Sequence, residues 1–241
     1  MIPKIIHLCW LSGDPYPRKI QDCLDSWKKH LPSYEIILWD TKRFNIHEVP
    51  WVEQAFNTKK YAFAADYIRL YALYHHGGIY LDSDVEILPY FVGAETSGTI
   101  EAAILGAEKG CDWIKCCLDY YEGRNFIRED GSYDIRMLPE ILNETILRLK
   151  PVINMPSGSN IDDLKKKDLG EAVYVLPKEY FSPKVFDSRE VFLTPETHAI
   201  HHYQNSWFSH KAFAYYRTRT LFIKIFGYKA VRSLEKMLLK R

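Results

Sequence analysis

The hydrophobic and polar positions at the start of the chain predict a strand, a helix and a second strand. Ile2–Trp10 is a short apolar run that ends at a turn cluster, and we interpret it as a buried strand. Apolar residues recur at helical spacing over Ile20–Leu31, and Pro32 follows the last of them, which is typical of a helix end. Tyr34–Trp39 predicts the next strand. This order favours a parallel α/β sheet.

A longer apolar segment follows at residues 61–74, where 12 of the 14 residues are hydrophobic. A helix that is apolar on every side is usually buried, so we expect this one inside the protein. The pattern stops at the run His75-His76-Gly77-Gly78, and Ile79–Ile87 then predicts one extended stretch.

The rest of the chain contains shorter periodic segments without an internal repeat or a clear domain boundary. We expect strands at Ile100–Leu105, Tyr174–Leu176 and Ala199–Tyr203, helices at Trp113–Tyr121 and Leu138–Leu149, and a loop over residues 154–170. The segment from Lys211 is mostly helical, and Gly227 is a candidate break in it.

Composition narrows the class of protein. The 241 residues are 47% hydrophobic and 26% charged, which excludes a disordered or collagen-like chain. No apolar run reaches the roughly 18 residues that a membrane-spanning helix needs. The five cysteines form no CxxC pair, and the first residues resemble no signal peptide. We therefore expect reduced thiols in a cytoplasmic protein.

Charge is distributed unevenly along the chain. Residues 211–241 contain nine Lys or Arg and one acidic residue, a net charge of +8, whereas the remainder carries −7. The tail also has apolar stripes, which suits a helix lying on an anionic membrane surface. The alternative is an amphipathic helix packed on the domain. The chain shows no nucleic-acid-binding motif, so we expect no nucleic-acid partner.

The sharpest chemical feature is an acidic cluster directly after the two glycines. In an extended strand, Tyr80, Asp82, Asp84 and Glu86 would share one face. Neighbouring carboxylates repel each other unless a cation lies between them, and oxygen ligands favour Mg²⁺ or Mn²⁺. The alternative is a solvated strand end, because the pattern Asp-x-Asp alone is common.

Two charged residues interrupt the apolar helix. Asp66 and Arg69 are three residues apart and therefore lie on one face, where burial demands partners for both. A ligand with hydroxyls and phosphates would supply them, and a structural ion pair is the alternative. The turn at Gly77-Gly78 would bring this pair within reach of the acidic cluster. Neither GxGxxG nor GxxxxGK[ST] is present.

Together these stretches resemble a known family. The run from Ala65 through Asp66 and Arg69 to Gly77-Gly78 and the segment 79–86 is similar to the DXD region of family-32 glycosyltransferases and of the large glucosylating bacterial toxins. Further matching stretches are Ile2–His7 with Trp10, Tyr180–Pro183, and Thr197–His202 followed by Ser206-Trp207.

The resemblance implies an α/β fold of the GT-A type, with a single Rossmann-like nucleotide-sugar-binding domain over residues 1–210 and a basic helical tail over 211–241. It implies catalytic roles for Asp66, Arg69, Asp82 and Asp84, and a metal site at Asp82, Asp84 and His201. The implied donor contacts are Trp10, Asp66, Arg69, Gly78, Tyr80, Asp82, Ser206 and Trp207. Of the two adjacent histidines, His201 fits the pattern better than His202.

The implied activity is the retaining, metal-dependent transfer of a hexose from a nucleotide sugar. We expect Mn²⁺ or Mg²⁺ as the cofactor and UDP-hexose rather than GDP-mannose as the donor. The acceptor would be a glycan or lipid-linked glycan in surface polysaccharide synthesis, at the inner face of the cell membrane. Two departures from the pattern are the missing Thr-Gly-Pro near residues 157–160 and the missing N-terminal anchor of Golgi relatives.

The residues also allow other classes of protein. A metal-dependent phosphohydrolase or nucleotidyltransferase uses acids and divalent cations as well. A non-catalytic protein that only binds a nucleotide sugar would keep the same pocket. These readings differ in the product they predict, because only glycosyl transfer releases a nucleoside diphosphate.

Overall fold

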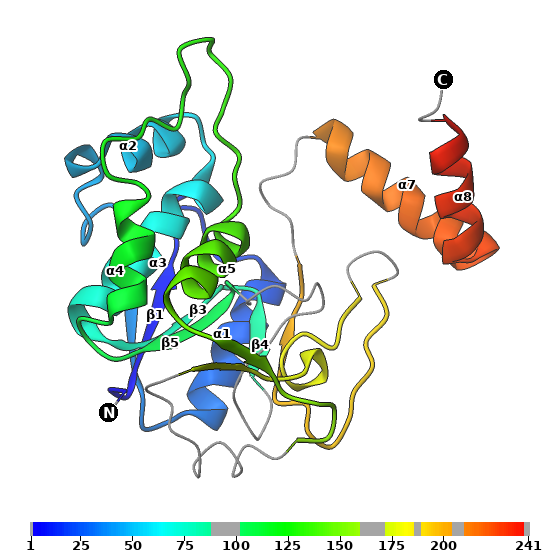
Figure 1. Ribbon diagram of the computed structural model, residues 1–241, viewed down its shortest axis with the longest axis horizontal. Helices are drawn as coiled ribbons and strands as arrows, with labels where there is room; N and C mark the ends of the chain where they lie inside the picture. Colours follow the sequence, from blue (N-terminus) through cyan, green and yellow to red (C-terminus); the bar gives the residue numbers. More distant parts are fainter. Residues whose placement is uncertain (1, 88–101, 160–171, 186–188, 204–209, 239–241) are drawn as a thin grey trace.

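The computed structural model describes residues 2–87, 102–159, 172–185, 189–203 and 210–238 (Figure 1). Its centre is a four-stranded sheet in the order β2-β1-β3-β5. These strands are β1 (Ile5–Cys9), β2 (Glu35–Trp39), β3 (Gly78–Leu81) and β5 (Ile104–Ala107). β1 pairs in parallel with β2 and β3, and β5 runs antiparallel to β3. The predicted α/β fold is confirmed, with a sheet that is parallel except for β5.

Side chains of β1 alternate between the two faces of the sheet. Ile6 and Leu8 join a core cluster with Trp27 of α1 (Arg18–His30), the helix that connects β1 to β2. Cys9 joins a second core cluster, which contains Ile68 and lies on the opposite face of the sheet. Two cores therefore sandwich the sheet, one on each face.

The helix predicted at residues 61–74 is confirmed as α3 (Tyr61–His76) and lies in the second core. It packs against α2 (Pro50–Asn57) and α4 (Asp112–Asp119), and α4 in turn packs against α5 (Leu138–Leu149). Figure 1 shows α2, α3 and α4 grouped together, apart from α1. α2 follows a short 3-10 helix at Ile46–Glu48, and neither helix was predicted from the hydrophobic pattern.

The single extended stretch predicted at Ile79–Ile87 is wrong. β3 ends at Leu81, and β4 begins only at Val85 (Val85–Ile87). A turn separates them, in which the Val85 N–H donates to the Asp82 carbonyl at 3.0 Å. The intervening Asp and Ser residues are common turn formers. β4 leaves the central sheet and pairs antiparallel with β8 (Ala199–His201).

The remaining strands are short. β6 (Val152–Asn154) and β7 (Val173–Val175) form a parallel pair, and a 3-10 helix covers Lys178–Tyr180. The expected strand at Ile100–Leu105 begins later, at Ile104. The expected loop over residues 154–170 begins at the end of β6, and its residues 160–170 lie outside the described part of the chain.

The basic tail forms two helices, α7 (His210–Phe226) and α8 (Tyr228–Leu238), which meet at the break expected at Gly227. Figure 1 shows them in orange and red, set apart from the central sheet. Among the described helices, none is both long enough and apolar enough to cross a membrane. All five cysteines lie in described parts of the chain and are free thiols.

Candidate active site

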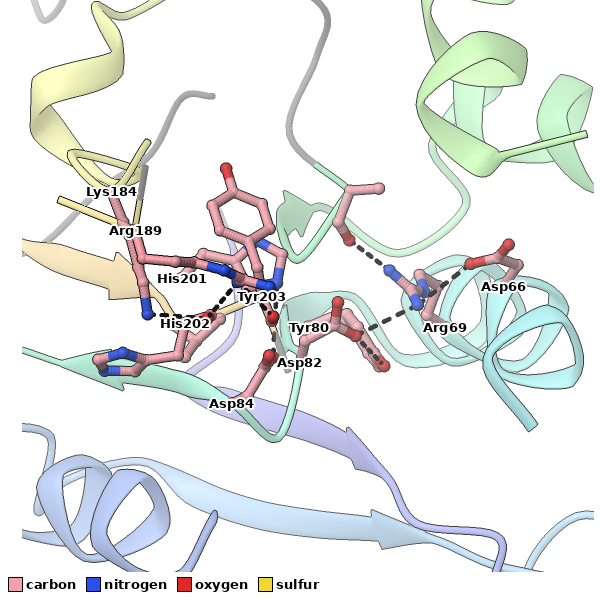
Figure 2. A network of polar contacts seen from close by, with 12 residues as sticks. Asp66, Arg69, Tyr80, Asp82, Asp84, Lys184, Arg189, His201, His202 and Tyr203 are labelled. Atoms are coloured by element: carbon pink, nitrogen blue, oxygen red, sulfur yellow. Dashed lines mark hydrogen bonds and ion pairs between the residues drawn. The ribbon is translucent and has the colours of Figure 1, made fainter. Parts of the chain in front are cut away.

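The acidic residues lie where β3 leaves the central sheet. Because β1 and β3 are parallel, their carboxyl ends share one edge, which is where open α/β sheets bind ligands. The turn after β3 presents Asp82 and Asp84, and the pairing of β4 with β8 brings His201 beside them (Figure 2). One ligand atom from each of these three residues lies within 4.8 Å of the other two.

This group fits a divalent cation. Two carboxylates and one imidazole suit Mn²⁺, which accepts oxygen ligands and tolerates nitrogen. His201 Nε2 lies 3.5 Å from an Asp84 oxygen, which leaves space for an ion between these two ligand atoms. The side chains of Asp84 and His201 are 12% and 13% exposed, so the group is recessed yet open to a ligand.

Arg69 connects helix α3 to the acidic turn. Its Nη2 lies 3.1 Å from an Asp66 oxygen and 3.2 Å from an Asp82 oxygen, and its Nη1 donates to the Ala102 carbonyl at 2.6 Å. The guanidinium also lies over the Tyr80 ring, 4.5 Å from its centroid. The side chain is 6% exposed, so this charge is buried and held by partners on several sides.

Burial raises the pKa of both carboxyl groups that Arg69 contacts. It raises the pKa of Asp66 to about 7, against the opposing charge of Arg69. Burial also raises the pKa of Asp82, and the neighbouring Asp84 carboxylate adds to the effect while Arg69 opposes it. A cation bound beside these groups would favour their ionised forms.

Two residues predicted to contact the donor also have structural contacts. The Tyr80 hydroxyl donates to Asp82 at 2.9 Å, and at 1% exposure this side chain supports Asp82 from behind. Gly78 lies at the opposite end of β3 from Asp82. Its φ is +105°, and a Cβ there would lie 2.7 Å from the Ile5 carbonyl oxygen. We therefore assign Gly78 to the close packing of β3 on β1.

Glu86 does not join the acidic group, contrary to the shared face that an extended strand predicts. The turn between β3 and β4 breaks the two-residue alternation, and Glu86 instead contacts His202 Nε2 at 2.9 Å and Lys19 Nζ at 3.1 Å. His201 and His202 thus contact different acids, Asp84 and Glu86.

Three further residues hold the end of β8 and were missed in the sequence analysis. Lys184 Nζ donates to the His202 carbonyl at 3.0 Å, and Arg189 Nη1 donates to the Tyr203 carbonyl at 2.8 Å. The Tyr203 ring packs on His201 with centroids 4.1 Å apart. Because Lys184 and Arg189 bind backbone carbonyls, no residue pattern in the sequence indicates their contacts.

Trp10 directly follows β1 at the same edge of the sheet. Its Nε1 donates to the Asp14 carbonyl at 2.8 Å, and its ring meets the edge of Tyr16 at 4.9 Å. The other two predicted donor contacts, Ser206 and Trp207, lie outside the described residues, so their placement over the phosphates stays a prediction.

Comparison with known proteins identifies the segment that carries most of this site. Residues 17–98 match the glycosyltransferase sugar-binding region containing the DXD motif. This segment is similar to the sugar-binding region of DXD glycosyltransferases. It includes Asp66, Arg69, Asp82 and Asp84, whereas His201 lies outside the DXD region.

Curated relatives match over the same part of the chain. Inositol phosphoceramide mannosyltransferase 3 of Schizosaccharomyces pombe is 36% identical over 88 residues, and mannosyl phosphorylinositol ceramide synthase SUR1 of Saccharomyces cerevisiae is 37% identical over 91. Each match covers 35% of this chain, but only 24% and 23% of the relative. The match thus spans about a quarter of the length of these relatives.

A solved structure, the PaToxG glycosyltransferase, is 20% identical with a TM-score of 0.45. The superposition covers 61% of this chain and 68% of that one.

Proposed function

We propose that this protein is a retaining, metal-dependent glycosyltransferase that moves a hexose from a nucleotide sugar to a hydroxyl of a glycan or lipid-linked glycan. The observation that carries the proposal is the meeting of Asp82, Asp84 and His201 within 4.8 Å, beside the Asp66–Arg69 pair of α3. A metal site next to a buried polar pair suits a ligand that has both phosphates and sugar hydroxyls.

Asp82, Asp84 and His201 would hold Mn²⁺, with Mg²⁺ as the alternative. When bound, such an ion neutralises charge on the departing diphosphate, which makes it a better leaving group. Arg69 and the Tyr80 hydroxyl fix Asp82 in place before any ligand arrives. This preorganisation spares the site the cost of arranging its charges during the reaction.

Asp66 and Arg69 would orient the donor sugar. The Asp66 side chain is 13% exposed, and its carboxylate can accept hydrogen bonds from sugar hydroxyls while Arg69 holds its other side. Trp10 would lie beside the base, and Ser206 and Trp207 would close over the phosphates. A fixed sugar orientation lets the acceptor hydroxyl attack on the face that the diphosphate leaves, which gives retention.

The donor and the acceptor are proposed only as chemical classes. The names of the yeast relatives include mannosyl transfer to inositol phosphoceramide, which adds support for a mannosyl donor and a lipid acceptor. UDP-hexose is the donor class expected from the sequence, and GDP-mannose is the alternative that these names favour. We propose surface polysaccharide synthesis at the cytoplasmic face of the cell membrane as the setting.

The decisive experiment incubates the full chain with Mn²⁺ and a panel of UDP-hexoses and GDP-mannose, and identifies the nucleotide released. Release of nucleoside diphosphate by the wild type, and its loss in the Asp84→Asn variant, would support glycosyl transfer. Asp25→Asn is the matched control, because Asp25 is an exposed acid on α1. Release of nucleoside monophosphate would instead indicate a phosphohydrolase. Donor binding without turnover on any acceptor would indicate a non-catalytic binder.

A further inference from the structure

The two tail helices form a hairpin with its own internal contacts. α7 ends at Gly227, which has a φ of +80° and donates its N–H to the Ile223 carbonyl at 2.8 Å. Ile223 and Val231 are buried at 6% and 8% exposure. Arg219 Nε donates to a Glu235 oxygen at 2.7 Å and thereby connects α7 to α8. The hairpin is therefore held together by its own residues.

The tip of this hairpin exposes a cluster of large apolar side chains. They follow one face of the last turns of α7 and continue past Gly227, with exposures of 43–63%: Leu221, Phe222, Ile225, Phe226 and Tyr228. The rings of Phe222 and Phe226 lie 5.7 Å apart, so the patch is continuous there. Packing of the apolar stripe on the domain, the alternative expected from the sequence, is wrong for its residues Leu221, Phe222, Ile225 and Phe226. A clustered apolar patch of this kind marks an interaction surface.

The charges around the tip are positive. Glu235 is the one acidic residue of the tail, and it is bound by Arg219 and by the Tyr215 hydroxyl at 3.0 Å. Exposed cations of the hairpin near the apolar tip include Arg217, Lys224, Lys229 and Arg232. Apolar side chains flanked by cations match the interface of an anionic bilayer, where the side chains enter the acyl boundary and the cations meet headgroups.

We propose that the α7–α8 hairpin docks the protein on an anionic phospholipid surface, with the apolar tip around Gly227 entering the interface. The docking rests on the exposed residues of the hairpin and uses no residue of the candidate active site. It would hold the sheet near the bilayer and so favour acceptors that are themselves in the membrane, which is the part that rests on the proposed function.

The test is co-sedimentation of the full chain with vesicles. Wild-type protein is expected to bind vesicles of equal parts phosphatidylcholine and phosphatidylglycerol. Its affinity for vesicles of pure phosphatidylcholine should be lower by about tenfold or more. Replacing Leu221, Phe222, Ile225 and Phe226 with Gln should lower the affinity for the anionic vesicles by about tenfold or more. Circular dichroism checks that this variant keeps its helices.

The matched control replaces equally exposed apolar residues elsewhere with Gln: Ile135, Leu147, Phe192 and Leu193. This control variant should bind vesicles as the wild type does. Equal binding by the tip variant and the wild type would overturn the proposal. So would sedimentation velocity that shows a lipid-free dimer of the wild type and a monomer of the tip variant, because the patch would then join two copies. Sugar transfer to a soluble acceptor is measured in parallel for the wild type and the tip variant. Transfer without vesicle binding shows that only the docking has failed, and binding without transfer shows that only the proposed function has failed.

Discussion

Arg69 Nη2 lies 3.2 Å from an Asp82 oxygen, which ties the buried helix α3 to the turn that carries the DXD acids. The same nitrogen lies 3.1 Å from Asp66, so two carboxylates share one guanidinium. A buried arrangement of this kind is stable only while its charges balance. Arg69 therefore has a structural task in addition to any contact with a donor.

Replacing Arg69 with Met should destabilise the protein by about 3–5 kcal/mol, because Asp66 and Asp82 lose the buried cation that they share. Urea unfolding measures this change. The control is Lys115→Gln, which breaks an exposed ion pair with Asp119 on α4 and should cost less than about 1 kcal/mol. Equal losses in the two variants would contradict a buried network at Arg69.

Much of the fold was predictable because its central elements have strong local patterns. The strand, helix and strand of residues 2–39 and the apolar α3 are examples. The break between β3 and β4 was not predicted, because the hydrophobic alternation of residues 79–87 continues through the turn. What decides the break is the long-range pairing of β4 with β8, more than 100 residues later.

The candidate site also has residues that the sequence predicted and residues that it did not. Asp66, Arg69, Asp82 and Asp84 belong to a local motif, and the structure brings them together at the carboxyl edge of β3. The alternation that grouped Glu86 with them fails at the turn. Lys184 and Arg189 bind backbone carbonyls of a distant strand, and such contacts leave no signal in residue spacing.

Gly78→Ala should destabilise the protein more than the substitution of a glycine that has open space around it. A Cβ at Gly78 would lie 2.7 Å from the Ile5 carbonyl oxygen, at a positive φ, which predicts a loss of about 2–3 kcal/mol. Gly131→Ala is the control, since Gly131 also has a positive φ but has open space around it and should cost about 1 kcal/mol. Thermal unfolding compares the two variants, and a smaller loss at Gly78 would refute the packing role.

His7 should make the stability of the protein fall in acid. It is fully buried; Nδ1 accepts from Trp39 Nε1–H at 3.0 Å, and Nε2–H donates to the Gly77 carbonyl at 2.8 Å. Burial lowers the pKa of His7. Below about pH 6.5 the unfolded chain therefore takes up a proton that the folded protein resists, and stability falls by up to about 1.4 kcal/mol per pH unit until the folded pKa is reached.

The comparison that isolates this effect is His7→Gln, because burial also lowers the pKa of His76 and His202. Urea unfolding across the acid range should show a shallower decline for the variant than for the wild type. If the free energy of unfolding fell equally with pH in the variant and the wild type, His7 would have the same pKa in the folded and unfolded protein, which would contradict this prediction.

Manganese binding tests the central claim most directly. Titration of Mn²⁺ followed by electron paramagnetic resonance, in the presence of a nucleoside diphosphate, should detect one tight site in the wild type. Asp84→Asn should weaken that site by about tenfold or more, since it removes a ligand. Glu86→Gln should leave it unchanged, because Glu86 contacts His202 and Lys19. Unchanged Mn²⁺ affinity in Asp84→Asn, or equal losses in Asp84→Asn and Glu86→Gln, would contradict a metal site at Asp82, Asp84 and His201.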